Sequence, residues 1–406
     1  MPETFTYKVK DRAGKIVEGS LEAENAQLVV SKLRSMGYVP IEIEQKGGAN
    51  LGRELKIPGL SDRVKLKDVA IFSRQFATMI NSGLSLLRAL YILAEQTESK
   101  VLAETVNQVR IDVERGASLS QALAKHPKAF NRLYVSMVRA GEVGGSLDSV
   151  LLRLAETIEK QVELRRKVKS AMTYPMVVAI LVLLIVTAML LFVIPMFENI
   201  YKELGGTLPA PTQILIKISK ICRKFFYLIF LAEFGAAFFF RRWINSEDGR
   251  KKWDAIKLRI PVFGKLVRKT ALARFSRTLS ALVRSGVPIL ESLEITSETA
   301  GNYVVANAVR DTQAAVKRGD PLSKKLQDHE VFPPMVVQMM AVGEETGALD
   351  EMLDKIADFY DQEVEATVDA LTSLIEPILI VVMGVCVGGM IIALYLPMFN
   401  IIKLIK

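Results

Sequence analysis

The chain of 406 residues has two cysteines and two histidines, and it lacks the sequence patterns of common catalytic sites. Cys222 and Cys386 lie beside or within apolar stretches, which excludes a disulfide framework. The absence of Gly-x-x-x-x-Gly-Lys-[Ser/Thr] excludes a P-loop of that kind, and no Gly-x-Ser-x-Gly elbow or Cys/His pair occurs. His126 and His329 stand before loops without nearby metal ligands. We expect no enzyme activity, no cofactor and no metal site.

An apolar export signal is also missing, because the chain begins Met-Pro-Glu-Thr and stays polar for a long distance. The net charge is +9, but no basic stripe with interleaved aromatics is present, so nucleic-acid binding is not expected. Basic clusters such as Arg165-Arg166-Lys167 and Arg241-Arg242 instead flank apolar runs. Such clusters favour the cytoplasmic face of a membrane and its anionic lipid. We expect a cytoplasmic N-terminus.

Two long runs carry no formal charge, Ser170–Phe197 and Pro377–Ile402. At about 1.5 Å per helical residue, each exceeds the roughly 30 Å hydrocarbon core of a bilayer. A third run, Phe225–Phe240, is shorter and contains Glu233. It is long enough to span the membrane only if flanking residues extend the helix, and a buried helix of a soluble region is the alternative. Three spans would place both large polar regions in the cytoplasm and the C-terminus outside.

The chain contains an internal duplication. Phe72-Ser73-Arg74 recurs as Phe275-Ser276-Arg277, and Pro195-Met196-Phe197 recurs as Pro397-Met398-Phe399. The offset changes by one residue, which is lost between the histidine and the phenylalanine that follows it in each copy. A register held over such a length indicates a repeated structural unit. Two copies, each followed by a membrane-length helix, favour a pseudo-symmetric scaffold.

Each copy predicts a bundle of six helices, the last of which continues into the membrane. Asp68 is expected to cap the first helix, and Ser118 opens a capping box for the short fourth helix. The second copy has Asp320-Pro321 there, a capping residue followed by proline at the first helical position. The fifth helix is expected from Asn131 to Arg139, ending at Ala140-Gly141.

The sharpest local motif is Gly-Glu-x-x-Gly-x-Leu-Asp, which occurs once in each copy. Its glycines indicate a turn between the fifth and sixth helices, with an aspartate in the first turn of the latter. The turn does not explain the glutamate, for which a partner contact and an ion pair inside the bundle remain equally open. A divalent cation held by Glu142 and Asp148 is disfavoured because few oxygens are available. The candidate partner-binding or repeat residues are Gly141, Glu142, Gly145, Asp148, Gly343, Glu344, Gly347 and Asp350.

Four further positions concern the spans. Pro175 and Pro377 are expected to kink the last helix of each bundle near the lipid boundary. Glu233 and Glu376 are carboxylates within or beside spans, where charge is costly unless paired or hydrated. Glu376 lies near the cytoplasmic edge, whereas Glu233 is expected to meet another span, a translocating peptide or a second subunit.

The predicted fold is mainly α, with duplicated six-helix-bundle cytoplasmic modules, three transmembrane helices and a small N-terminal α/β unit. Alternating apolar residues and a helix capped by Gly37 indicate that unit. The expected order is the α/β unit 1–45, a linker 46–65, the first bundle 66–169, span 170–197, a periplasmic connection 198–224, span 225–240, a cytoplasmic connector 241–268, the second bundle 269–370, span 371–400 and a periplasmic tail 401–406.

In these features the chain resembles the GspF/PilC family, the inner-membrane platform proteins of type IV pilus assembly and type II secretion. The resemblance rests on Phe72-Ser73-Arg74-Gln75, the two glycine-glutamate turns, Tyr174-Pro175, Leu208-Pro209-Ala210-Pro211-Thr212 and the two Pro-Met-Phe segments. Phe5-x-Tyr7 with Gly14 and Gly19 is similar to the N-terminal segment of the family. The resemblance to the family covers essentially the whole chain.

The resemblance implies a non-enzymatic platform that is multi-pass in the cell inner membrane. Its implied partners are a cytoplasmic pilus-assembly ATPase, pilin or pseudopilin subunits, inner-membrane alignment proteins, further copies of the chain and the lipid bilayer. The pilus branch is favoured by the basic, glycine-containing front unit. The platform component of a type II protein secretion system is the alternative. A small membrane transporter is disfavoured because the spans have almost no polar lining.

Overall fold

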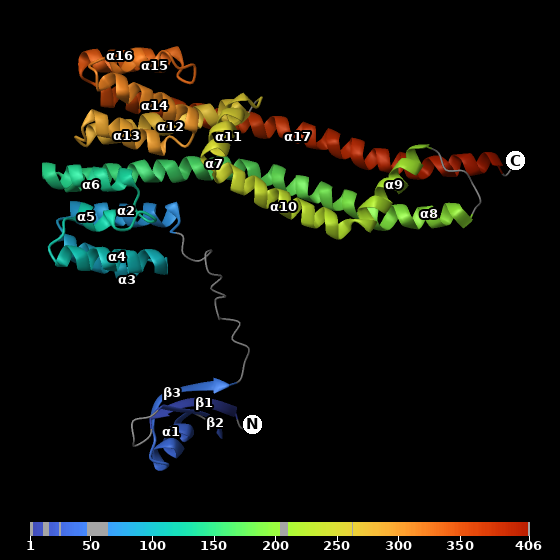
Figure 1. Cartoon of the computed structure of the whole chain (residues 1–406), viewed down its shortest axis with the longest axis horizontal. Coiled ribbons are helices and arrows are strands. Elements are labelled where there is room, and N and C mark those ends of the chain that lie inside the picture. Colours follow the sequence, from blue (N-terminus) through green and yellow to red (C-terminus); the bar gives the residue numbers. More distant parts are fainter. Residues whose placement is uncertain are drawn as a thin grey trace. The chain divides into compact units, whose positions relative to one another are not determined.

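The computed structural model describes residues 3–10, 16–23, 26–46, 64–203, 210–261 and 263–404. The chain divides into two compact units, Met1–Asp62 and Arg63–Lys406 (Figure 1). The predicted linker 46–65 lies almost wholly outside the described residues. The described elements of the second unit are all helical, and they place the duplicated sequence in two bundles.

The N-terminal unit contains an antiparallel sheet and one helix. Strand β1 (Glu3–Lys10) lies between β2 (Ile16–Ala23) and β3 (Val39–Lys46), and α1 (Ala26–Ser35) connects β2 to β3. Val9, Val29 and Leu33 form its small buried core. Gly37 has a φ of 83° and follows the helix, which is the left-handed conformation that glycine adopts most readily.

The first copy forms a bundle, called module 1 here, whose sixth helix is much longer than the others. Its helices are α2 (Leu66–Asn81), α3 (Leu86–Gln96), α4 (Lys100–Glu114), α5 (Leu119–Ala124), α6 (Arg132–Gly144) and α7 (Leu147–Ala188). Gly83 and Gly116 end α2 and α4 with positive φ angles of 83° and 96°. Helix α7 runs unbroken from the bundle into the charge-free sequence, as predicted.

The second copy, module 2, repeats this arrangement. Its helices are α12 (Phe263–Arg284), α13 (Ile289–Thr299), α14 (Tyr303–Val316), α15 (Leu322–Leu326), α16 (Pro334–Thr346) and α17 (Leu349–Leu404). Figure 1 shows α7 and α17 leaving the two bundles toward the same end of the unit. The duplication in the sequence is therefore a duplication of structure.

Helices also fill the sequence between the modules. A π-helical turn η1 (Met189–Val193) continues α7 and is followed by α8 (Ile194–Glu203), α9 (Ala210–Lys224), α10 (Phe226–Asn245) and α11 (Glu247–Arg259). Among the described residues, two helices are long and apolar enough to cross a membrane, within Leu147–Asn199 and Leu349–Ala393. Helix α10 extends beyond the predicted run 225–240 and includes Arg241 and Arg242.

Three predicted helix ends are wrong. Lys65 is the N-cap of α2, so Asp68 lies in the first turn, where a carboxylate still favours the helix dipole. Helix α15 begins at Leu322 with Pro321 as its N-cap, and no side chain caps it from that position. Helix α6 continues through Gly141 and ends before Gly145. The cap by Ser118 is confirmed, since its side chain accepts a hydrogen bond from the Gln121 N–H.

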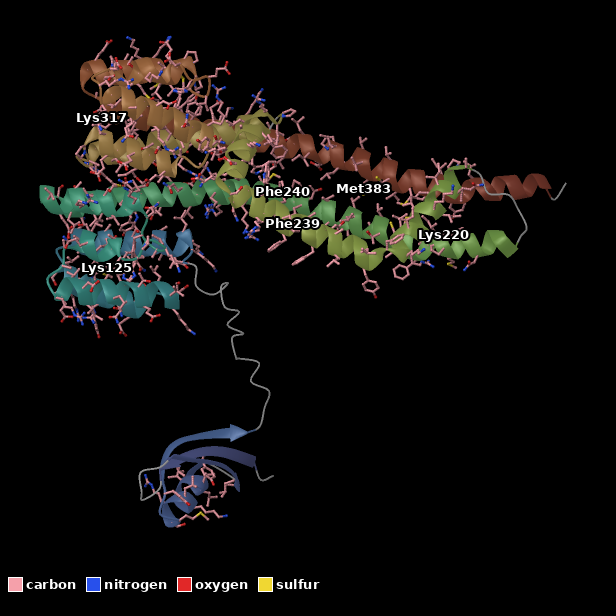
Figure 2. All side chains as sticks on the ribbon, in the orientation of Figure 1. Lys125, Lys220, Phe239, Phe240, Lys317 and Met383 are labelled. Atoms are coloured by element: carbon pink, nitrogen blue, oxygen red, sulfur yellow. The ribbon has the colours of Figure 1, made fainter. Side chains whose placement is uncertain are left out.

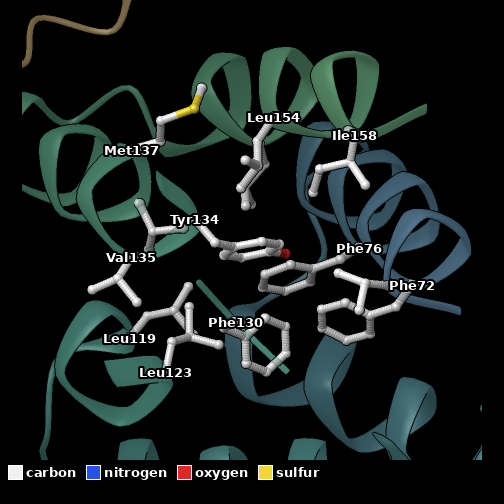
Figure 3. Close-up of a cluster of buried hydrophobic side chains, with 14 of the residues drawn as sticks. Phe72, Phe76, Leu119, Leu123, Phe130, Tyr134, Val135, Met137, Leu154 and Ile158 are labelled. Carbon is white, nitrogen blue, oxygen red and sulfur yellow. The ribbon is translucent and has the colours of Figure 1, made fainter. Parts of the chain in front are cut away.

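Aromatic rings fill the core of module 1 (Figure 3). Phe130 lies 5.6 Å from the ring centroid of Phe72 and 4.8 Å from that of Tyr134, and Phe76 stacks on Phe72. At the equivalent positions, module 2 keeps the pair Phe275–Phe332, at 5.0 Å. Apolar burial of this kind is the main favourable contribution to folding.

Candidate functional site

The glutamate of the first glycine-glutamate motif binds the start of a neighbouring helix. Glu142 Oε1 accepts a hydrogen bond from the Leu119 N–H at 2.5 Å. Its Oε2 accepts from the N–H and the hydroxyl of Ser120, at 3.1 and 2.5 Å. The first N–H groups of a helix have no intrahelical acceptor, and the positive end of the helix dipole favours an anion. Glu142 therefore fixes α5 against α6.

The second copy repeats this contact atom for atom. Glu344 accepts hydrogen bonds from the Leu322 N–H at 2.8 Å, and from the N–H and hydroxyl of Ser323 at 3.2 and 2.9 Å. This explains the error at Asp320, because a carboxylate from α16 already occupies the cap of α15. Among the described residues, both glutamates make hydrogen bonds and neither is in an ion pair. Binding of a partner by the motif stays a prediction.

The two glycines of the motif have different functions. Gly145 and Gly347 adopt φ angles of 66° and 72°, which end α6 and α16. Gly141 is helical, and a Cβ there would lie 3.1 Å from Leu147 Cα. The equivalent distance from Gly343 to Leu349 Cα would be 2.9 Å. The first glycine thus permits the close approach of consecutive helices, and the second permits the turn between them.

The aspartate of the motif differs between the copies. Asp350 accepts a hydrogen bond from Arg284 Nε at 3.0 Å. Burial raises the pKa of Asp350, but the hydrogen bond and charge of Arg284 lower it further, so that the pKa lies below its ordinary value. In module 1, Asn81 occupies the position of Arg284. Asp148 lies in the first turn of α7, near the positive end of its dipole.

A second ion pair, which the repeated motifs did not predict, joins the first and last helices of each module. Arg74 Nε donates to Glu159 Oε1 at 2.7 Å. At the equivalent positions, Arg277 Nη2 donates to Asp361 Oδ2 at 2.5 Å and to Asp358 Oδ1 at 3.1 Å. The recurrence of Phe-Ser-Arg was the signal available in the sequence. It marked the arginine, but the acidic partners lie too far along the chain to be assigned from spacing.

The two modules bind each other directly. Arg132 on α6 forms ion pairs with Glu294 and Glu298 on α13, both at 2.8 Å. Ala281, Leu282, Val287 and Ile295 of module 2 belong to the same buried cluster as the core of module 1. Farther along, Lys167 on α7 pairs with Glu365 on α17 at 2.9 Å. The modules therefore form one continuous helical body.

Helix α9 satisfies backbone carbonyls that two prolines leave without donors. The Ile194 N–H bonds to the Met189 carbonyl, and Pro195 has no N–H, so the carbonyls of Leu190 and Leu191 lose their usual donors. The Ser219 hydroxyl donates to Leu190, and Arg223 Nη2 donates to Leu191 at 3.0 Å.

The second copy uses the same device. Pro397 cannot donate to the carbonyl of Ala393, four residues earlier, and the Thr212 hydroxyl donates there instead. An unsatisfied carbonyl in hydrocarbon costs several kcal/mol. Helix α9 thus donates hydrogen bonds to the backbone just before both Pro-Met-Phe segments. It thereby connects the end of α7 that lies far from the bundle with the corresponding part of α17.

The remaining candidate positions lie apart from this network. Pro175 is buried in α7, Pro377 is exposed on α17, and both helices continue through them. Glu376 and Glu233 are exposed, and the described residues provide neither with a hydrogen bond or an ion pair. Around Glu233, α10 exposes Phe234, Phe238 and Phe239, the last of which is labelled in Figure 2.

Known families match both copies of the repeat and the N-terminal unit. The family described as type II secretion system (T2SS), protein F, matches residues 72–195 and again residues 275–397. The family described as type II secretion system protein F, N-terminal domain, matches residues 1–44. The two larger matches coincide with the two modules and their long helices.

Individual relatives cover nearly the full chain. A type IV pilus assembly protein PilC of Thermus thermophilus is 47% identical over 98% of this chain and 98% of its own length. A type IV pilus assembly protein TapC of Aeromonas hydrophila is 38% identical over 98% and 95%. A type II secretion system protein F of Pseudomonas aeruginosa is 34% identical over 99% of both chains. None of these names gives an enzymatic activity.

The matches cover most of the chain and agree with the duplication that the structure shows. This chain belongs to the type II secretion system protein F family, which includes type IV pilus assembly proteins of the PilC type.

Proposed function

We propose that this chain is a non-enzymatic inner-membrane platform of the type IV pilus assembly machine. It couples a cytoplasmic assembly ATPase to the insertion of pilin into the membrane or its extraction from it. The observation that carries the proposal is the pair of mutually bound modules, each continued by one unbroken helix of membrane-spanning length. The greater identity to pilus assembly proteins supports the pilus branch over the secretion branch.

The contact between the modules supports a multi-pass topology with three spans. Because module 1 binds module 2, both modules stand on one face of the membrane. A chain that crosses through α7 must return before it reaches module 2, and α10 is the apolar helix available among the described residues in between. Its exposed phenylalanines suit lipid contact. The N-terminal unit and both modules then lie in the cytoplasm, with α8, α9 and the C-terminus at the periplasmic side.

The ends of the modules farthest from the spans are the proposed sites of ATPase contact. The glycine-glutamate turns lie there, because α7 and α17 begin at these turns and run to the membrane (Figure 1). Glu142 and Glu344 fix the short helices, so the contact itself falls to exposed neighbours such as Val143, which is 86% exposed. Alignment proteins and further copies of the chain are proposed to bind elsewhere on the same body.

Glu233 is the proposed contact for a membrane partner. An exposed carboxylate within an apolar helix is costly in lipid unless a cation or hydrogen-bond donor meets it. The described residues of this chain offer none. A second copy of the platform, or the N-terminal amine of a pilin or pseudopilin subunit, would provide such a group.

Deletion of the gene and complementation test the proposal. The deletion strain should lack surface filaments while pilins still accumulate in its membrane, and the intact chain should restore the filaments. Loss of a secreted protein with normal filaments would instead assign the chain to type II secretion. Normal filaments and normal secretion would contradict both. Solute flux through liposomes containing the pure chain would support a transporter.

A further inference from the structure

A cavity of about 600 Å³ lies beside the point where module 1 continues toward the membrane. It is formed by α7, α11, α12, the turn 300–302 between α13 and α14, and Asp361 of α17. Leu164, Val168, Met172 and Leu266 give it an apolar wall. Leu266 also belongs to a buried apolar cluster with residues of α17, and Leu164 and Val168 pack against that cluster. The volume falls in the range of about 300–1,000 Å³ that is usual for small-molecule sites.

The charged side chains around this cavity are nearly all positive. They are Lys160, Arg165, Lys169, Lys257, Arg274 and Arg277, against the single carboxylate of Asp361. Arg277 is paired with Asp358 and Asp361, and Lys257 is paired with Asp254. For the other four cations, the part of the chain that the structure describes provides no ion-pair partner. Of these four, Lys160, Arg165 and Lys169 are exposed and Arg274 is half-buried, and the side chains that line the cavity have a net positive charge.

Arg274 is the strongest indication that an anion belongs there. Burial, and next the charge of Arg165, lowers the pKa of its guanidinium below the ordinary value. Among the described residues, no side chain or backbone group accepts a hydrogen bond from it. Arg274 is half-buried, and the partial removal of a cation from water without a partner is unfavourable, which favours binding of an anion.

The space occupied by Arg274 depends on a glycine. Gly301 has a φ of 76°, and a Cβ at this position would lie 2.1 Å from Arg274 Nη1. The absence of a side chain at Gly301 therefore leaves room for the guanidinium at the edge of the cavity. In module 1 the equivalents of Arg274 and Gly301 are Ile71 and Glu98, so the arrangement is not a product of the repeat.

The position of the cavity identifies the kind of anion. Lys169 is the last charged residue before the run Ser170–Phe197, and Met172 lies one turn inside that run. A ligand there would meet cations at one end and membrane hydrocarbon at the other. A guanidinium binds phosphate oxygens strongly, and basic pockets at the cytoplasmic edge of spans suit lipid headgroups.

We propose that this cavity binds one anionic phospholipid, whose phosphodiester contacts Arg274 and Arg165 while an acyl chain lies along Val168 and Met172. The lipid links α7 of module 1 to α12 of module 2 and neutralises their cations. The lipid proposal rests on the membrane location given under the proposed function, and it does not depend on a role in pilus assembly. If the lipid proposal fails, the expected filament phenotype of the deletion strain is unchanged.

The test uses the full-length chain purified in a non-ionic detergent. Native mass spectrometry and thermal unfolding are recorded with phosphatidylglycerol, with phosphatidylcholine and with soluble glycerol 1-phosphate. We expect retention of one phosphatidylglycerol and a higher Tm with that lipid alone. Arg274→Gln should weaken binding by about tenfold or more, as expected for the loss of a charge-assisted hydrogen bond. Arg274→Lys should keep most of it, and Gly301→Ala should weaken it.

Arg115→Gln is the matched control, because it removes an exposed arginine of module 1 far from the cavity. It should bind phosphatidylglycerol as the unchanged chain does. Equal retention of both lipids, or unchanged binding by a folded Arg274→Gln variant, would overturn the proposal. An equal rise in Tm with glycerol 1-phosphate would show that a soluble phosphate, and not a lipid, is the ligand. Circular dichroism without lipid establishes that each variant is folded.

Discussion

The two modules have the same helices but different surroundings. In module 1, the side chain of Arg74 is 38% exposed where it pairs with Glu159, whereas the equivalent Arg277 in module 2 is only 14% exposed. The difference arises because α7 of module 1 packs along α12 and α17 of module 2. The ion pair of module 2 is therefore less exposed than its counterpart in module 1.

The two modules also differ in the aromatic content of their cores, which is greater in module 1. Four aromatic side chains are in contact in module 1, and only two of the equivalent positions in module 2, Phe275 and Phe332, are aromatic. Val336 replaces Tyr134, so the Ser276 hydroxyl lacks the partner that Ser73 has. The buried cluster of module 1 includes Ala281, Leu282, Val287 and Ile295 of module 2, whereas the described buried cluster of module 2 is formed by its own residues. The core of module 1 is therefore richer in aromatic rings and is also completed by side chains of its neighbour.

The largest expected effect is on the aromatic cores. Phe130→Ala and Phe332→Ala should each cost about 3–5 kcal/mol of unfolding free energy. Phe130 has two ring neighbours and Phe332 has one, so Phe130→Ala should cost about 1 kcal/mol more. Hydrogen exchange measured by mass spectrometry reports on the two modules separately. Equal losses of unfolding free energy in the two variants would contradict the proposed difference between the cores.

The next effect concerns the glutamates that fix the short helices. Glu142→Gln and Glu344→Gln should each cost about 1–3 kcal/mol, because charge-assisted hydrogen bonds to helix N–H groups are weakened. Exchange should rise in α5 and α15, respectively. Val143→Asp is the control, since it changes an exposed neighbour. It should leave exchange unaltered and, on the proposed function, weaken capture of the ATPase. Normal exchange in Glu142→Gln would show that the carboxylate serves a partner instead.

A smaller effect separates Ser73 from Ser276. Ser73 Oγ donates to the Val69 carbonyl at 2.7 Å, and Tyr134 lies within hydrogen-bonding distance, so Ser73→Ala should cost about 1 kcal/mol. The buried Ser276 hydroxyl has no partner among the described residues, so Ser276→Ala should be neutral or stabilising. Urea unfolding of the two variants checks the sign. Destabilisation by Ser276→Ala would show that this hydroxyl has a partner.

The smallest effect is the acid response of the two ion pairs. The hydrogen bond from Arg74 lowers the pKa of Glu159, so this pair stabilises the fold above the ordinary carboxyl value and is lost as pH falls through the lowered pKa. Burial raises the pKa of Asp361, so the folded state binds that proton first and gains stability as pH falls toward the ordinary value.

Unfolding measured between pH 7 and pH 3 separates the two groups. Glu159→Gln should reduce the loss of stability at the acid end. Asp361→Asn should remove a gain nearer neutral pH. The same direction of change in both variants would contradict the difference in burial.

Local and periodic signals in the sequence were sufficient for the helices and the duplication. Ser118 caps its helix as expected, and the sixth helix of each module continues into the charge-free sequence as expected. Contacts between distant segments were not accessible in this way. The Glu344 cap of α15, the Arg132 contact with α13 and the Thr212 donation to Ala393 each depend on tertiary packing. The glutamate could be recognised as repeated, but its acceptor role required the neighbouring helix.

Cysteine labelling tests most directly whether both modules stand on one face of the membrane. Single cysteines replace Lys125 of module 1 or Lys317 of module 2, both exposed and labelled in Figure 2, in a chain whose Cys222 and Cys386 are changed to serine. A membrane-impermeant maleimide should leave both sites unlabelled in intact spheroplasts and label both in inverted membrane vesicles. Labelling of one site in spheroplasts and the other in inverted vesicles would contradict the paired platform.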